Sequence, residues 1–111
     1  MKVSEIPYER ADAEKVCGVI DKAVEKINAA KSVDDVLEAR ELVNDALRDF
    51  YTESSLANAR FTLNTKDEFY SAEKDYYDEK MPVVQVSYLK YADAILSSKF
   101  LDELKTKINP V

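Results

Sequence analysis

The shortness of the break between two long helical patterns constrains this chain more than any other feature of its sequence. Apolar residues recur at alternating spacings of three and four from residue 33 to 61 and again from 70 to 95. This spacing places them on one face of an α-helix. Only Asn64 and Thr65 separate the two patterns, and so short a connection turns the second helix back antiparallel to the first. The sequence therefore predicts a long helical hairpin.

The first helix of the hairpin is predicted over residues 33–63. Ser32 is a favourable N-cap residue, and Asp35 stands in the position of a capping-box partner. After the helix, Asn64 tolerates the left-handed backbone conformation that commonly ends a helix.

The second helix of the hairpin is predicted over residues 66–97, with a kink near Pro82. Thr65 and Glu68 form a complete capping box at its start. Proline inside a helix removes one backbone hydrogen bond and crowds the carbonyl group four residues earlier. The apolar spacing nevertheless keeps its phase across the proline, and two independent helices would have no reason to stay in register. The predicted inward-facing residues are Tyr70, Lys74, Tyr77, Met81, Val84, Tyr88, Tyr91 and Ile95.

Two shorter helices are predicted to cover the open end of this hairpin. The first runs over residues 11–30, and the second follows Ser98 over residues 99–108 and stops at Asn109-Pro110. One glycine and three prolines in 111 residues fit a few long helices rather than many strands and turns. The predicted fold class is all-α, with residues 1–111 forming one helical domain.

Residues 1–10 form a separate N-terminal segment. It is mostly polar, and around Pro7 it carries the short apolar set Val3, Ile6 and Tyr8. We expect an extended arm that lays these side chains on the helices, and a disordered terminus is the alternative. The segment has no apolar signal-peptide core.

Charge and residue usage exclude several classes of function. The formal net charge is −6, and the lysines and arginines are scattered. Nucleic acid is not an expected partner, because neutralising phosphates requires a basic face. No segment is long and apolar enough to cross a bilayer, so we expect no membrane contact and a cytoplasmic location. Cys17 is the only cysteine and is expected to be a small buried side chain rather than a reactive thiol.

The chain contains no histidine. This absence removes the Ser-His-Asp and Cys-His catalytic arrangements, the H-E-x-x-H motif and zinc fingers. Six acidic residues lack the spacing of a calcium loop and are expected to form a solvated helix face. They are Asp67, Glu68, Glu73, Asp75, Asp78 and Glu79. We therefore predict no catalytic residue, no metal ligand and no cofactor in this chain.

Aromatic residues gather around the predicted hairpin tip. They are Phe50, Tyr51, Phe61, Phe69, Tyr70, Tyr76 and Tyr77. The tip is expected to be partly uncovered, and an exposed aromatic patch commonly marks a contact surface. We take these residues as a candidate interface with another part of a larger protein or with a second copy. The alternative is an ordinary core in a compact four-helix bundle.

The stretch SLANARFTLNTKDEFYSAEKDYYDEKMP, residues 55–82, resembles the early helical region of oligoendopeptidase F-like zinc metallopeptidases, which are relatives of thimet oligopeptidase. The opening MKVSEIPYER and the segment SSKFLDELKTKI resemble the flanking parts of the same region. The resemblance therefore covers essentially the whole chain. Ala11 and Lys99 stand where many relatives have proline, and both changes suit a helix start.

The resemblance implies a non-catalytic N-terminal domain, a fragment of a larger peptidase, that walls the substrate channel and packs on the catalytic domain. Such enzymes cleave short peptides with one zinc ion held by H-E-x-x-H and a later glutamate. Since this chain lacks histidine, zinc and the peptide substrate belong to the full-length parent. The alternative is a free-standing helical interaction module that self-associates through the hairpin tip as a homodimer. A reading frame that continues into an H-E-x-x-H segment would favour the first interpretation.

Overall fold

The computed structural model describes residues 2–109. Met1 of the predicted arm, and Pro110 and Val111 after the last predicted helix, lie outside the described residues. The described part forms a short 3₁₀ turn and four α-helices. They are η1 (Val3–Glu5), α1 (Ala13–Asn28), α2 (Val33–Leu63), α3 (Glu68–Leu96) and α4 (Leu101–Ile108). Since residues 2–109 contain no strand, the all-α prediction is confirmed.

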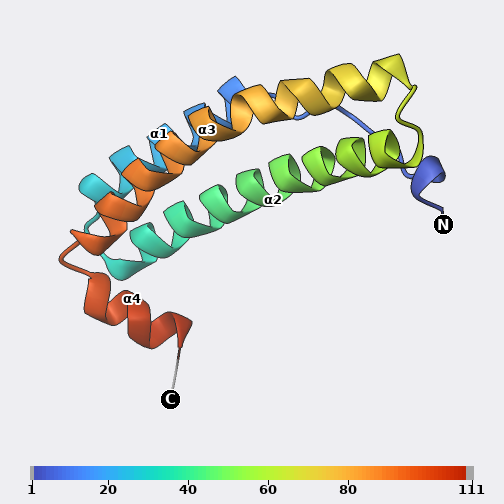
Figure 1. Cartoon of the computed structure of the whole chain (residues 1–111). Helices are drawn as coiled ribbons and strands as arrows, with labels where there is room; N and C mark the ends of the chain where they lie inside the picture. Colours follow the sequence, from blue (N-terminus) through green and yellow to red (C-terminus); the bar gives the residue numbers. More distant parts are fainter. Residues whose placement is uncertain (1, 110–111) are drawn as a thin grey trace.

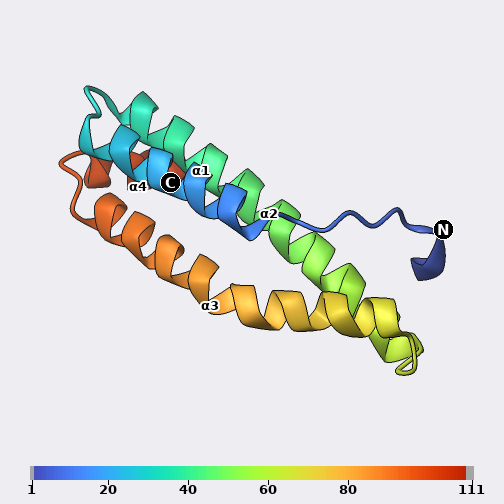
Figure 2. The same ribbon diagram turned by 90° about the horizontal axis from the view of Figure 1, so that it is seen from above.

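The helices α2 and α3 run antiparallel and are joined at one end of an elongated molecule (Figure 1). The molecule measures 51 × 28 × 17 Å along its principal axes. Helix α1 packs against both hairpin helices in the half away from the tip, and α4 packs against α2 (Figure 2). The predicted hairpin with two short covering helices is therefore confirmed.

The core lies between α1, α2 and α3. On α1 and α2 the buried apolar residues follow the predicted spacing of three and four. They are Ala13, Val16, Ile20, Ala23 and Ile27 on α1, and Val33, Val36, Val43, Leu47, Phe50 and Ala57 on α2; Ala39 and Leu56 are buried beside this row. Burying one large apolar side chain stabilises a fold by about 1.5–3 kcal/mol, so this layer holds α1 on the hairpin. Cys17 is half-buried and packs against the core.

Two polar residues of α3 occupy inward positions that were predicted for their neighbours. Glu73 and Ser87 are buried, whereas Lys74 forms a surface ion pair and Tyr88 is 40% exposed. The prediction was wrong at these two turns. At the first of them, the carboxylate is neutralised by Arg10 from the N-terminal arm, a partner that helical periodicity does not reveal.

Pro82 lies inside α3, and the helix continues through it. Helix α3 changes direction near its middle (Figure 2). Tyr77 and Val84 lie on either side of the proline, and both are buried in the same core. Packing on both sides therefore keeps the two halves in one helix, as predicted, despite the hydrogen bond that proline removes.

Helix α3 begins two residues later than predicted. Its N-cap is Asp67, whose carboxylate accepts a hydrogen bond from the Tyr70 N–H at 3.0 Å. A carboxylate is also favoured by the positive end of the helix dipole, which explains why Asp67 caps the helix in place of Thr65. Asn64 is not left-handed, because its φ is −147°. Its side-chain oxygen instead accepts a hydrogen bond from the Lys66 N–H at 3.2 Å.

The other helices also differ slightly from the predicted bounds. Helix α1 begins at residue 13 because the carboxylate of Asp12 accepts the first free backbone N–H groups. Helix α4 begins at residue 101, since the Ser98 hydroxyl accepts the Phe100 N–H and forms a turn before the helix. Ser32 occupies the N-cap of α2 but makes no side-chain hydrogen bond there. Within residues 2–109, no helix combines the length and apolarity that crossing a lipid bilayer requires.

Gly18 lies in the middle of α1, and apart from its chain neighbours and the adjacent helix backbone no atom lies within 4 Å of the position that a Cβ would occupy. We therefore expect Gly18→Ala to raise the free energy of unfolding by about 0.5–1 kcal/mol, because glycine loses more backbone entropy in a helix than alanine does. Urea denaturation followed by circular dichroism measures the change. A destabilised variant would show that Gly18 makes a close contact after all.

Candidate functional site

The N-terminal arm, residues 2–12, runs along the hairpin and reaches its tip (Figure 1). The turn η1 contacts α2. Val3 and Ile6 each remain 37% exposed, so apolar burial contributes little to holding this end of the arm. The predicted extended arm is present, and it is held by polar contacts in addition to the ring of Tyr8.

Glu73 on α3 is the centre of the polar contacts that hold the arm. Its side chain is only 4% exposed. One carboxylate oxygen accepts hydrogen bonds from the Tyr8 hydroxyl at 2.6 Å and from Nε of Arg10 at 3.0 Å. The other oxygen accepts from the terminal nitrogen of the same guanidinium. Such a two-point contact between arginine and a carboxylate is among the stronger polar interactions in proteins.

Two neighbouring tyrosines hold the backbone where the arm leads into α1. The Tyr77 hydroxyl accepts the Ala11 N–H at 2.9 Å and lies 3.0 Å from the hydroxyl oxygen of Tyr8. The Tyr76 hydroxyl donates to the Ala11 carbonyl at 2.8 Å and accepts the Ala13 N–H at 3.0 Å. The start of α1 is thus fixed to α3 by side chains one helical turn from Glu73.

The contacts among Glu73, Arg10, Tyr8 and Tyr77 determine the protonation state of each side chain in this cluster. The Arg10 guanidinium lowers the pKa of Glu73, although burial opposes the shift. Burial, followed by the hydrogen bond to Glu73, raises the pKa of Tyr8. Burial also raises the pKa of Tyr77. At neutral pH the cluster therefore holds a carboxylate, a guanidinium and protonated tyrosines, which suits a structural role and provides no acid or base near neutrality.

Arg60, near the end of α2, ties the arm to the tip. Its guanidinium donates to the carbonyl oxygens of Val3 at 2.9 Å and of Ile6. It also donates to the Tyr70 hydroxyl at 2.6 Å. The Tyr8 ring packs edge-on against the Tyr70 ring, with the centroids 5.8 Å apart. Part of the hairpin tip is therefore occupied by the chain's own N-terminal arm.

The seven residues of the candidate interface do not form one exposed surface. Phe50 and Tyr77 are 0% and 1% exposed, and their rings pack edge-on within the core. They cannot offer a contact surface while the chain is folded, which corrects their place in the candidate interface. The remaining five residues are the half-buried Phe61, Tyr70 and Tyr76 and the exposed Tyr51 and Phe69.

An open hollow of about 500 Å³ lies between the arm, α1 and α2. Its lining mixes apolar side chains, the basic Arg10 and Lys15, and the acidic Glu9, Asp12, Asp45, Asp49 and Glu53. Within residues 2–109, no group of three or more metal-ligating side chains is arranged to hold a metal ion. The hollow therefore offers a concave surface of mixed charged and apolar character, and the zinc site of a metallopeptidase does not fit the residues present.

Residues 3–111 match the family described as the peptidase M3 N-terminal domain. The chain belongs to this family. Comparison with curated proteins gives no match. The family match, together with the solved structures described next, confirms the predicted resemblance to the N-terminal region of oligoendopeptidase F-like enzymes.

Solved structures show the same relationship. PZ peptidase A with inhibitor 2 is 34% identical with a TM-score of 0.90, over 96% of this chain and 19% of its own. A protein described as oligoendopeptidase F is 36% identical with a TM-score of 0.90, over 96% and 19%. An oligoendopeptidase F from Bacillus anthracis strain Ames is 33% identical with a TM-score of 0.88, over 94% and 19%. The chain thus spans about a fifth of the length of these relatives.

Sequence reasoning missed the residues that fix the arm in this M3 N-terminal domain. Arg10 and Arg60 were not singled out, and Glu73 was placed on a solvated acidic face. Glu73 is instead 3% exposed. One signal was available, because counting back four residues from the inward-facing Tyr77 reaches Glu73. The tyrosines and the arginine that pair with Glu73 come from segments whose positions the sequence alone does not give.

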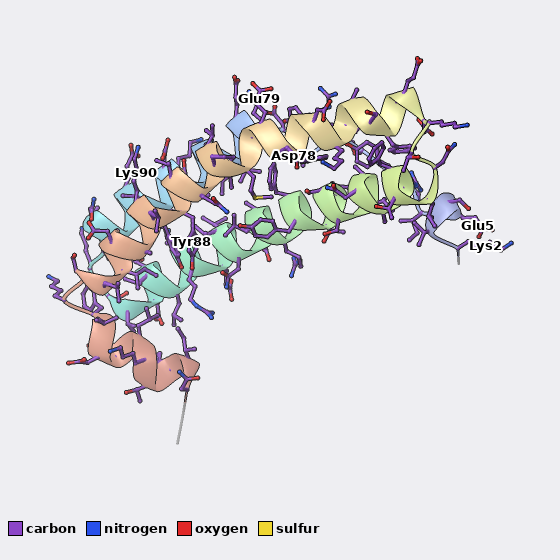
Figure 3. The ribbon with its side chains drawn as sticks, in the orientation of Figure 1. Lys2, Glu5, Asp78, Glu79, Tyr88 and Lys90 are labelled. Atoms are coloured by element: carbon purple, nitrogen blue, oxygen red, sulfur yellow. The ribbon has the colours of Figure 1, made fainter. Side chains whose placement is uncertain are left out.

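The M3 N-terminal domain should lose stability when the charge of Glu73 is removed. We expect Glu73→Gln to lower the free energy of unfolding by about 1.5–3 kcal/mol, the usual contribution of a hydrogen bond to a charged group. Urea denaturation at pH 7 measures the loss. Glu79→Gln is the matched control, because Glu79 extends from α3 on the side away from α2 (Figure 3). The control should change stability by less than about 0.5 kcal/mol.

The contribution of Glu73 should depend on pH in one direction. Because the pKa of Glu73 is lowered in the folded chain, its contribution is complete above the ordinary carboxyl pKa of about 4.3. It disappears as the pH falls through the lowered pKa. The stability difference between wild type and Glu73→Gln should therefore be full at pH 7 and shrink at more acidic pH. Equal differences at pH 7 and pH 3 would contradict the assignment.

Proposed function

We propose that this chain serves as the non-catalytic N-terminal domain of a zinc-dependent oligopeptidase, where it packs on the catalytic domain and forms part of the substrate-channel wall. One observation carries the proposal. Nearly the whole chain, 96%, superimposes at a TM-score of 0.90 on about a fifth, 19%, of PZ peptidase A. A domain kept so closely within a longer peptidase is expected to support the remainder of that chain.

The division of chemistry follows from the residues present. In the peptidases that the chain resembles, a zinc ion held by H-E-x-x-H and a later glutamate supplies the activation of water. This chain contains no histidine. We therefore assign zinc, the general base and the bond-breaking step to the catalytic domain. The role of this chain is then to pack on that domain and to shape the substrate channel.

The helical architecture is suited to forming a rigid part of the substrate-channel wall. Helices are stiff elements, and here the arm clamps the hairpin through Glu73 and Arg60. Such a surface can restrict the entry of folded proteins without moving during turnover. Self-association through the tip, the alternative, has less support, because Phe50 and Tyr77 are buried in the core.

A chimeric peptidase tests the proposed function. The matching segment of the 36% identical oligoendopeptidase F is replaced by this chain, and a second version simply lacks the segment. We expect the chimera to cleave short fluorogenic peptides with kcat/KM at least about tenfold above the shortened enzyme, because a misplaced site loses about 10²-fold. The chimera should also leave a folded protein uncut.

Two outcomes would count against the proposal. A chimera no more active than the shortened enzyme would remove the supporting role. Cleavage of peptides by the pure chain supplied with zinc would show that the chain carries its own chemistry. The control is a chimera that carries Glu79→Gln, which should match the unmodified chimera because Glu79 is exposed.

A further inference from the structure

The outer face of α3 changes character at Pro82. Before the proline, the exposed residues include Asp75, Asp78 and Glu79. After it, four aliphatic side chains are exposed to water. They are Val83, Val86, Leu89 and Leu96, which are 53%, 55%, 65% and 66% exposed and are called the α3 apolar face below. On an ideal α-helix, Val86, Leu89 and Leu96 share one side, and Val83 lies at the edge of that side nearest the buried residues.

The rest of the domain packs on the opposite side of the same helix. The buried residues of this half are Val84, Ser87, Tyr91 and Ala94. Helix α3 packs on α1 and α2, while α4 packs on α2 (Figure 1). Glu79 and Lys90 extend from α3 on the side away from α2 (Figure 3). A row of exposed apolar side chains, unlike single ones, commonly marks a contact surface.

We propose that the α3 apolar face is the surface on which the remainder of the peptidase packs. This inference rests on the proposed function and identifies the part of the domain that carries it. The occupant is an apolar surface of the following domain in the same polypeptide. Lys90 and Asp93, exposed on the same half of the helix, lie between these apolar residues at helical spacing, so the surface that packs there must also offer polar partners to them.

The size of the relatives favours this occupant over a second copy of the chain. The domain makes up 19% of the solved peptidases that it matches, so four fifths of each such chain lies beyond it. A surface in the same polypeptide is present at an effective concentration of the order of millimolar, without any assembly step. A second copy of the chain would have to displace this tethered surface in order to bind the α3 apolar face.

The acidic half of α3 sets the limit of the proposed surface. Placing carboxylates in an apolar interface without partners costs several kcal/mol, so the contact ends near Pro82. The hairpin tip then remains with the arm, which occupies part of it through Arg60 and Tyr8. The expected contact with the rest of the peptidase therefore lies on the second half of α3 rather than at the hairpin tip.

Photo-crosslinking in the zinc-loaded chimera described above tests the proposal. The photoreactive residue p-benzoylphenylalanine is placed at position 89 or, as a matched control, at position 63. Both positions hold exposed leucines, 65% and 72%, but Leu63 lies at the tip. We expect cross-links from position 89 to the catalytic domain of the same chain, and none from position 63. Mass spectrometry locates them.

The outcomes separate this inference from the proposed function. An active chimera that cross-links from position 63 and not from 89 would overturn the inference and leave the proposed function intact. Cross-links between two chimera molecules would assign the face to a second copy and would also overturn it. An inactive chimera would remove the proposed function and this inference together.

A charge substitution gives an independent readout. In the chimera, Leu89→Glu should lower kcat/KM at least about tenfold, the effect of disrupting a central interface residue. Leu63→Glu should leave kcat/KM unchanged. In the isolated chain both variants should unfold at the same temperature as wild type, because both leucines are exposed. Equal activity of the two chimeric variants would overturn the inference.

Discussion

The N-terminal half of this domain depends on the neutralisation of one buried carboxylate. Glu73 lies on the inward side of α3, where an unpaired charge would cost several kcal/mol. Arg10 supplies the opposite charge and Tyr8 a further hydrogen bond. Both partners come from the arm, so the same contacts that make Glu73 tolerable also fix the arm and the entry into α1. The burial of one acidic side chain and the course of the first twelve residues are two aspects of a single interaction.

Local patterns predicted most of the fold. The two-residue break specified the hairpin, and the spacing of three and four residues identified the inward faces of α1 and α2. Continuity of phase across Pro82 predicted one bent helix. The errors had two causes, a long-range partner at Glu73 and a competing local cap at Asp67. Glu73 is buried because Arg10 neutralises it, and α3 starts after Asp67 because a carboxylate there is a stronger cap than Thr65.

The candidate interface could be predicted only in part. Tyr51 and Phe69 are exposed, but Phe50 and Tyr77 stack in the core. Aromatic content alone does not distinguish these cases, since the same side chains serve cores and contact surfaces. The α3 apolar face was hidden for a related reason. The sequence prediction did not single out its valines and leucines, and the structure shows that α1 and α2 pack on the buried side of that helix.

The arm also has a consequence for the order of assembly. Tyr8 and Arg10 contact Glu73 at sequence separations of 65 and 63 residues. During synthesis these first residues leave the ribosome early, yet their partners on α3 are made only after α2 is complete. The hairpin closes through a short local turn, whereas the arm must close a loop of more than sixty residues, which carries a larger entropic cost. The earliest residues to be made are therefore among the last to find their place.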